Sequence, residues 1–240
     1  MRLDRWIDRS LNYGREAIET YLRMRGAAQV VLDLGAGYGK DLEAARRLFP
    51  RAELVAVECD DSKCRHLAAR GFVVRQVDLE RAALPFSSES VDIIIANQIL
   101  EHVKELFWVF HNVSRVLKTG GLLIVSSPNL ASLHNRLLLL AGRQPTVLNL
   151  ASAHVRGFTL PGLLHFLRAC FPGGYKLVAR TGANFYPFPP GIAKVLARLM
   201  PGLAWGFVAA FEKTRSYRDE FIKFVRGEEM ETNFYVGDGS

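Results

Sequence analysis

The feature that most constrains this chain is a series of short, almost wholly apolar segments that alternate with segments of helical periodicity. In the first half these runs are VVLDL from Val30, LVAVE from Leu54, FVVRQV from Phe72, VDIIIAN from Val91 and GLLIVSS from Gly121. Strands with one solvated face alternate apolar and polar residues, whereas strands covered on both faces are apolar throughout. Alternation of such strands with helices is the βαβ pattern. The sequence therefore predicts an α/β fold with a doubly wound, mostly parallel sheet.

The second half of the chain supplies further elements of the same sheet. Apolar residues at three- and four-residue spacing between Lys104 and Leu117 predict an amphipathic helix, which we expect to end at Gly120-Gly121. The runs YKLVAR from Tyr175 and GFVAAFEK from Gly206 are strand-like and flank a Pro/Gly-rich linker and a short helix, IAKVLARLM. These two runs bring the expected number of strands to seven.

Length and composition favour one domain over residues 1–240. The chain has 240 residues, of which 49% are hydrophobic, which is enough for a sizeable core. Within it we expect an N-terminal helical segment over 1–27 and a C-terminal appendage over 217–240. Residues 130–171, after the fifth strand, read as a helical insertion over the sheet. Ligands of open α/β sheets bind at the carboxyl ends of the strands. We therefore expect this insertion to form a lid over the substrate that accepts the transferred group, and we call it the acceptor lid.

Charge and cysteine content narrow the partners and the compartment. The net charge of +7 favours anionic partners, but no cluster of Lys and Arg indicates nucleic acid. The three cysteines form no regular framework, and the N-terminal residues lack an apolar signal region, so a cytoplasmic protein is expected. The apolar stretch 195–211 is interrupted by Pro201, Gly202 and Gly206, which argues against a membrane span.

A glycine-rich turn follows the first expected strand. VVLDLGAGYGK places Gly35, Gly37 and Gly39 between that strand and a helix, where the backbone can approach a ligand. Glu58 ends the second strand, about 20 residues later, where a carboxylate can accept hydrogen bonds from ribose hydroxyls. The dinucleotide fingerprint requires glycine or alanine where this chain has Lys40, so the pattern fits a nicotinamide cofactor imperfectly.

Several motifs occur together in a fixed order. They are VLDLGAGYG, VECD, VDLERAALPFSSESVDIII, ANQILEHV and RVLKTGGLLIVSSPN. In this order they resemble the class I S-adenosylmethionine-dependent methyltransferases, in the small-molecule branch of types 11, 12 and 23, over roughly residues 30–129. Thr119 stands where that family usually has proline. The resemblance implies a Rossmann-like methyltransferase fold and S-adenosyl-L-methionine as the cofactor. No pair of histidines in the sequence has the close spacing of metal ligands, so we expect no metal site.

The resemblance also implies roles for particular residues. Gly35, Ala36 and Gly37 would hold the methionine end of the cofactor, with Asp33 positioning the loop or the ammonium group. Glu58 would bind the ribose, and Asn97 would lie beside the sulfonium. On the adenine side, Cys59 would pack on the ring, Asp78 would accept from the amino group, and the Leu79 amide would lie nearby.

The acceptor side is left with alternatives. His102 is the first candidate for a general base if the acceptor is a hydroxyl, and packing beside Glu101 is its other reading. The segment SAHVRGFT, which contains His154, resembles a segment near the acceptor pocket of related enzymes. The resemblance implies a role for His154 at the substrate, and a polar surface or core residue is its other reading. The four leucines 137–140 point to all sides of a helix and face either the protein's own core, a second subunit, or the lipid chains of a membrane surface.

The function that we expect is transfer of a methyl group from S-adenosyl-L-methionine to an oxygen of a small or lipid- or sugar-linked acceptor. A nicotinamide-dependent oxidoreductase and a non-catalytic S-adenosylmethionine-binding scaffold remain the alternatives. The sequence does not indicate an oligomeric state.

Overall fold

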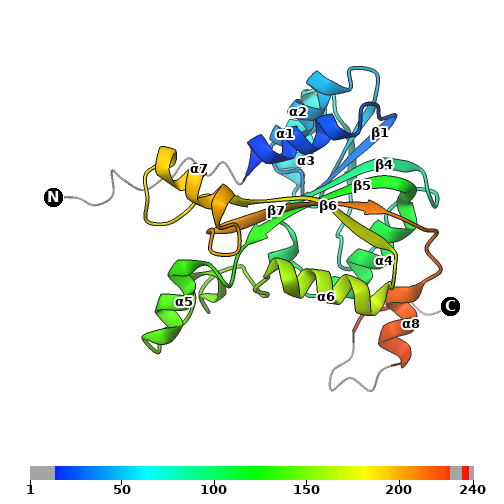
Figure 1. The fold of residues 1–240 in the computed structure, drawn as a ribbon. Helices are drawn as coiled ribbons and strands as arrows, with labels where there is room; N and C mark the ends of the chain where they lie inside the picture. The colour runs from blue at the N-terminus through cyan, green and yellow to red at the C-terminus, as the bar shows by residue number, and fades with distance from the viewer. Residues whose placement is uncertain (1–13, 228–233, 238–240) are drawn as a thin grey trace.

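The computed structural model describes residues 14–227 and 234–237, in which seven strands form one sheet (Figure 1). The strand order is β3-β2-β1-β4-β5-β7-β6, and β7 runs antiparallel to both of its neighbours. The bounds are β1 (Val30–Leu34), β2 (Glu53–Glu58), β3 (Val73–Gln76), β4 (Val91–Asn97), β5 (Leu117–Pro128), β6 (Tyr175–Ala183) and β7 (Gly206–Lys213). The predicted fold, a doubly wound and mostly parallel seven-stranded sheet, is confirmed.

Helices cover both faces of the sheet, which explains why its strands are apolar throughout. One face carries α1 (Arg15–Met24), α2 (Lys40–Leu48) and α3 (Asp61–Ala69), and the other carries α4 (Leu106–Val116), α6 (Leu160–Cys170) and α8 (Glu220–Gly227) (Figure 1). Two cores result. Ile18, Leu22 and Leu42 pack on the first face, and Phe110, Leu163 and Phe221 on the second, all of them buried.

The helix after β4 is shorter than expected. We predicted that it continues to Gly120-Gly121, but α4 ends at Val116 and Leu117 already pairs with Val91 as part of β5. The reason is tertiary. The Leu117 carbonyl accepts a hydrogen bond from the buried Lys213 ammonium at 2.7 Å, so this segment takes extended geometry despite its helical periodicity.

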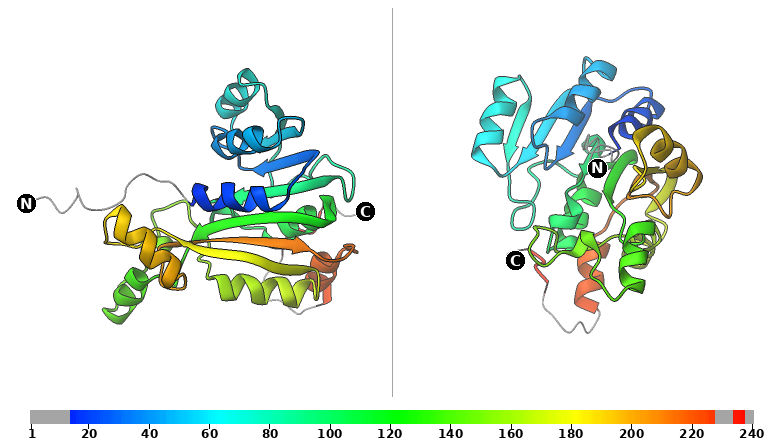
Figure 2. Two further views of the ribbon diagram at one scale, coloured as in Figure 1. Left: turned by 45° about the horizontal axis from the view of Figure 1, so that its top comes forward. Right: turned by 90° about the vertical axis from the view of Figure 1, so that its left-hand side faces the viewer.

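The segment 130–171 divides into an outer and a core part. The outer part contains α5 (Leu133–Leu140) and the 3₁₀ turn η3 (Thr146–Leu148). By contrast, α6 buries Leu163, Leu167 and Cys170 in the core beneath the sheet. Only the outer part, up to Thr159, stands at the carboxyl ends of the strands beside α7 (Pro190–Leu199), as Figure 2 shows from two sides. The acceptor lid remains a prediction, now confined to this part.

The expected terminal segments are described only in part. Of the segment 1–27, the structure describes α1, and residues 1–13 lie outside the described residues. Of the segment 217–240, residues 228–233 and 238–240 lie outside them as well. The described part of that appendage packs closely, because Phe221 in α8 is fully buried and Phe234 contacts the ring of Phe107.

The sheet changes winding direction between β1 and β4. The chain leaves β1 for α2 on one face and leaves β4 for α4 on the other (Figure 1). The carboxyl ends of these two neighbouring strands therefore form the switch point of the sheet, outside which open α/β sheets bind their ligands in a crevice.

At the amino ends of the strands, the Asp92 side chain on β4 forms hydrogen bonds with two other segments of the chain. Its carboxylate accepts hydrogen bonds from the amides of Gln29 and Val30 at 2.9 and 3.0 Å, and from the Lys118 ammonium at 2.8 Å. Burial alone would raise the pKa of Asp92, but these hydrogen bonds outweigh it and lower the pKa below its ordinary value. The ionised carboxylate therefore stabilises the folded state.

We expect Asp92→Ala to lower the free energy of unfolding at pH 7 by about 1–3 kcal/mol, because two amides and an ammonium lose their acceptor. A carboxylate with a lowered folded-state pKa stabilises the fold above its unfolded pKa of about 3.9. Urea unfolding of both proteins should thus differ at pH 7 and converge as the pH falls below about 4. Equal stability at pH 7 would contradict this role for Asp92.

Candidate active site

The glycine-rich turn lies at the carboxyl end of β1, on the crevice. The amides of Gly35 and Ala36 both donate to the Val57 carbonyl at the end of β2, at 2.8 and 3.2 Å. Gly35 has a positive φ of 65°, and a Cβ there would lie 2.6 Å from the Ile99 side chain. Glycine at this position therefore lets the residues after β4 approach the turn.

Gly37 differs from Gly35 in what surrounds it. Its φ is +56°, yet a Cβ at this position would meet no described protein atom closer than 4.0 Å, the Gly35 carbonyl oxygen. The Gly37 amide donates to Glu58 Oε2 at 3.0 Å. The turn is thus fixed by Glu58, while the space above Gly37 stays open for a ligand.

Three carboxylates surround the turn. Glu58 also accepts, through Oε1, the amides of Cys59 and Asp60 at 3.0 and 3.1 Å. Burial, together with the charges of Asp41 and Glu58, raises the pKa of Asp33 well above its ordinary value. Asp41, in the first turn of α2, accepts from the Asn97 amide at 2.7 Å and lies 3.5 Å from the Arg15 guanidinium.

Burial raises the pKa of both Asp33 and Asp41, and the charges of Asp41 and Glu58 raise that of Asp33 further. A cation bound beside these three carboxyl groups would stabilise their ionised forms. Such a site attracts a cationic ligand and repels a pyrophosphate, because like charges in a partly buried site interact strongly. It therefore suits a sulfonium and an ammonium group better than the pyrophosphate of a dinucleotide.

The residues predicted for the adenine side lie at the neighbouring strand ends. Cys59 follows β2 and is exposed, and the Asp78 charge contributes to raising its pKa, after burial and the Glu58 charge. Asp78 is exposed, and its Oδ1 accepts the Glu80 amide at 2.9 Å. Leu79 packs against the core from a half-buried position. An exposed carboxylate and thiol thus border one end of the crevice.

Asn97 ends β4 and links the turn to β5. Its amide nitrogen donates to Asp41, and its amide oxygen accepts the Ser126 hydroxyl. The next residue, Gln98, has a positive φ of 56°, and its amide side chain donates to the Ser126 oxygen at 3.2 Å. Asn97 is therefore held in place beside the glycine-rich turn.

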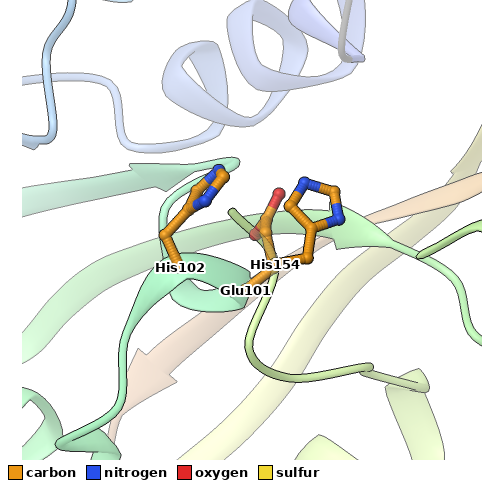
Figure 3. A group of neighbouring side chains, drawn as sticks. All are labelled: Glu101, His102 and His154. Carbon is orange, nitrogen blue, oxygen red and sulfur yellow. The ribbon is translucent and has the colours of Figure 1, made fainter. Parts of the chain in front are cut away.

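Beyond Gln98, the turn η2 (Leu100–His102) brings a second polar group to this edge. Figure 3 shows the imidazoles of His102 and His154 on either side of the Glu101 carboxylate. One ligand-type atom from each of the three side chains lies within 4.8 Å of the others, and the two rings are 4.8 Å apart. The structure thus brings together both histidines that the sequence singled out.

Backbone contacts hold the two segments of this group against each other. The Glu101 carbonyl accepts the amides of Val155 and Arg156 at 2.8 and 3.2 Å. The Arg156 guanidinium donates to the carbonyls of Val103 and Lys104 at 3.2 and 2.7 Å. Arg156 therefore fixes the position of His154.

Glu101 itself is a buried carboxyl group, 1% exposed. Oε2 accepts the Ser127 hydroxyl at 3.2 Å, whereas Oε1 is buried without a hydrogen-bond partner among the described residues. Burial raises the pKa of Glu101 to about 7. Burying a polar oxygen without a hydrogen bond costs free energy, and a bound ligand or ion would offset this cost.

Sequence reasoning missed Asp41, Arg15 and Glu101 as site residues. A carboxylate directly after a glycine-rich turn was an available signal for Asp41. For Glu101 the signal was its position beside His102. Arg15 lies in another helix, so no local pattern could have placed it near Asp41.

The strand order with one antiparallel strand, together with a glycine-rich turn flanked by carboxylates, defines the class I methyltransferase fold. Residues 32–125 match the family described as a methyltransferase domain. The chain thus carries a class I S-adenosylmethionine-dependent methyltransferase domain, and the family identified from its motifs is confirmed. The cofactor of this family is S-adenosyl-L-methionine.

Known proteins resemble parts of the chain. A probable S-adenosylmethionine-dependent methyltransferase of Mycobacterium tuberculosis is 34% identical over 110 residues, which are 45% of this chain and 39% of that protein. The chain thus matches about two fifths of that relative's length. A malonyl-[acyl-carrier protein] O-methyltransferase of Methylococcus capsulatus is 31% identical over 177 residues, 70% of this chain and 61% of the relative.

Among solved structures, an S-adenosylmethionine-dependent methyltransferase from Mesorhizobium loti superimposes with a TM-score of 0.59. That alignment covers 84% of this chain and 98% of the other, at 17% sequence identity. At this identity the similarity establishes the fold.

Proposed function

We propose that the chain transfers a methyl group from S-adenosyl-L-methionine to a hydroxyl oxygen of a small or lipid- or sugar-linked acceptor. The observation that carries this proposal is the open glycine-rich turn surrounded by Asp33, Asp41 and Glu58. These carboxylates favour a cofactor with a sulfonium and an ammonium group. The same charges disfavour the alternative of a nicotinamide dinucleotide.

The proposed cofactor contacts follow the crevice from one end to the other. Asp33, Gly35, Ala36 and Gly37 hold the methionine end, and Asn97 lies beside the sulfonium. Glu58 accepts from the ribose hydroxyls, and Cys59, Asp78 and Leu79 contact the adenine. In this arrangement the residues position the donor, and alignment of donor and acceptor contributes up to about 7–11 kcal/mol to such displacements.

The acceptor side of the proposal rests on Glu101, His102 and His154. Glu101 and His102 lie just beyond Asn97 along the chain, and the segment after η3 brings His154 next to them (Figure 3). In the transfer, an acceptor oxygen bonds to the methyl carbon, the carbon–sulfur electron pair stays on sulfur, and the acceptor proton leaves. His102 or His154 is our candidate for the group at which it leaves. The relatives that are malonyl-[acyl-carrier protein] O-methyltransferases also support oxygen as the acceptor atom.

Calorimetry with S-adenosylhomocysteine and with NADH tests the cofactor assignment. We expect the chain to bind S-adenosylhomocysteine and to release no measurable heat with NADH. Labelled-methyl transfer to mixtures of sugars, lipids and quinones then tests the reaction. Binding of NADH alone would overturn the proposal, and cofactor binding without transfer to any acceptor class would favour the scaffold alternative.

We also propose that the acceptor is reached at a membrane surface. Large apolar side chains are exposed on α5, on the turn that follows η3 and on α7. They are Leu137, Leu139, Leu140, Leu150, Ile192, Val195 and Leu199, between 52% and 91% exposed. Both helices project from the same end of the molecule, at the carboxyl ends of the parallel strands (Figures 1 and 2). Such a grouping marks an interaction surface.

The charges around this apolar end favour anionic lipid as the proposed partner. Between Glu105 and Glu212 the sequence has ten Lys and Arg residues and no Asp or Glu. Arg136, Arg143 and Arg198 are exposed on or next to α5 and α7. Exposed apolar side chains flanked by basic residues suit an interfacial helix on an anionic bilayer. Among the described residues, no helix is long and apolar enough to span a bilayer.

We expect the chain to co-sediment with vesicles of phosphatidylglycerol and phosphatidylcholine, and Leu139→Ser combined with Leu140→Ser to reduce the bound fraction at least about fivefold. These leucines are 57% and 84% exposed, so their replacement removes membrane contact and leaves the core intact. Met24→Ser, at an apolar residue 54% exposed on α1, is the matched control. Recovery of wild-type protein in the supernatant with and without vesicles would refute the membrane contact.

A further inference from the structure

We propose that Glu101, His102 and His154 bind a divalent first-row transition-metal ion, such as Zn²⁺, Mn²⁺ or Fe²⁺, which presents the acceptor oxygen to the methyl donor. The proposal assigns a metal site where the sequence indicated none. It rests on the proposed function only for the use of the ion, because the site itself follows from the three side chains (Figure 3).

The hydrogen bonds of the two histidines fix which nitrogen is available to an ion. Nδ1 of His102 lies 3.1 Å from the Ala153 carbonyl oxygen, and Nδ1 of His154 lies 3.1 Å from the Val147 carbonyl oxygen. A carbonyl oxygen only accepts, so in each neutral ring Nδ1 carries the proton and Nε2 keeps its lone pair. Metal-binding histidines are oriented in this same way by backbone carbonyls.

Glu101 supplies the third ligand and the negative charge. Its Oε1 is buried and has no hydrogen-bond partner among the described residues, and none of the ion pairs described includes it. No hydrogen bond within the described residues joins this carboxylate to either imidazole, so it does not orient a histidine as a catalytic dyad would. A cation at this position would compensate a buried carboxylate that is otherwise unpaired.

The three ligands are held together by the protein. The Glu101 carbonyl receives the Val155 and Arg156 amides, and Ser127 holds the second carboxylate oxygen. The ligand atoms lie within 4.8 Å of one another. Zinc–ligand bonds of about 2.0–2.2 Å place tetrahedral ligands about 3.4 Å apart, so side-chain rotations of about an ångström complete the set.

The donor set indicates the class of ion and of acceptor. Two imidazoles and one carboxylate suit first-row transition metals, whereas Mg²⁺ and Ca²⁺ prefer oxygen ligands. Three protein ligands also leave a coordination position open, as in catalytic sites. A hydroxyl bound there loses its proton to water more readily, and its oxygen then takes the methyl group. With the ion bound, water therefore takes the proton in place of His102 or His154, whose Nε2 lone pairs bind the ion. The class of acceptor is thus a hydroxyl whose oxygen coordinates the ion.

Cobalt(II) titration of the untagged, EDTA-treated chain tests this site, with the visible absorption of bound Co²⁺ as the readout. We expect one Co²⁺ per chain, displaced by Zn²⁺ and not by an equal concentration of Mg²⁺. His154→Ala and Glu101→Gln should each weaken Co²⁺ binding at least about 100-fold, since each removes one of three ligands. His165→Ala, at an exposed histidine on α6, is the matched control and should bind as the wild type does.

Calorimetry with S-adenosylhomocysteine on the same samples separates this inference from the proposed function. Retained S-adenosylhomocysteine binding in His154→Ala and Glu101→Gln would show that both variants fold. Wild-type protein without stoichiometric Co²⁺, or folded His154→Ala that binds Co²⁺ like the wild type, would overturn the metal site. Failure of the wild type to bind S-adenosylhomocysteine would instead refute the proposed function.

Discussion

Valine in place of Gly37 is expected to weaken S-adenosylhomocysteine binding at least about 100-fold, which corresponds to roughly 2.7 kcal/mol. Gly37 has a positive φ of 56°, and a Cβ there would point into space that no described protein atom occupies within 4.0 Å. The valine side chain would therefore meet the methionine end of the proposed cofactor and little of the protein. Calorimetric titration of the purified variant measures the loss.

A second glycine separates backbone strain from loss of the binding space. Gly173, in the turn between α6 and β6, also has a positive φ, of 68°, and open surroundings. Valine at either position incurs a left-handed backbone cost of about 1–2 kcal/mol. Gly173→Val should therefore lose similar thermal stability but keep full affinity. Equal affinity of folded Gly37→Val and wild type would contradict the placement of the cofactor over this turn.

The sequence was sufficient to predict the sheet because its strands are covered on both faces. Nearly continuous apolar runs identified β1 and β4 with their observed bounds, Val30–Leu34 and Val91–Asn97. The end of α4 was missed, since the extended geometry of Leu117 depends on Lys213 far away in the chain. Periodicity in the sequence carries no information about such a contact.

The position of α6 shows the same limit. Its leucine-rich sequence resembles that of α5, and both were assigned to one insertion. The structure distinguishes them by burial, since Leu163 and Leu167 lie in the core while Leu139 and Leu140 are exposed. Apolar content alone does not tell a core helix from a surface helix with an external partner.

The candidate site was predictable where one motif carries several residues. The glycine-rich turn and Glu58 are separated by one βαβ unit, whose geometry brings them together. The acceptor side could not be assembled this way. His154 reaches His102 only because Arg156 and the Glu101 carbonyl fix its segment on η2, and these are contacts between segments distant in the sequence.

Glu58→Ala is expected to weaken S-adenosylhomocysteine binding by about 3–6 kcal/mol, because two charge-assisted hydrogen bonds of about 1.5–3 kcal/mol each are lost. Calorimetry gives the affinity directly. Glu58 also accepts the amides of Gly37, Cys59 and Asp60. The substitution therefore removes the proposed ribose acceptor and, at the same time, the group that fixes the glycine-rich turn.

Glu58→Gln separates these two contributions. Glutamine keeps one carbonyl oxygen for the turn, but its NH₂ group cannot accept and it carries no charge. If the carboxylate acts on the ribose, Glu58→Gln should lose much of the affinity while its thermal stability stays nearer the wild type than that of Glu58→Ala. Glu53→Ala, at the exposed start of β2, is the matched control and should change neither quantity. Glu58→Ala with an affinity within about threefold of wild type, a difference of roughly 0.7 kcal/mol, would exclude the ribose role, because the loss of even one charge-assisted hydrogen bond exceeds it.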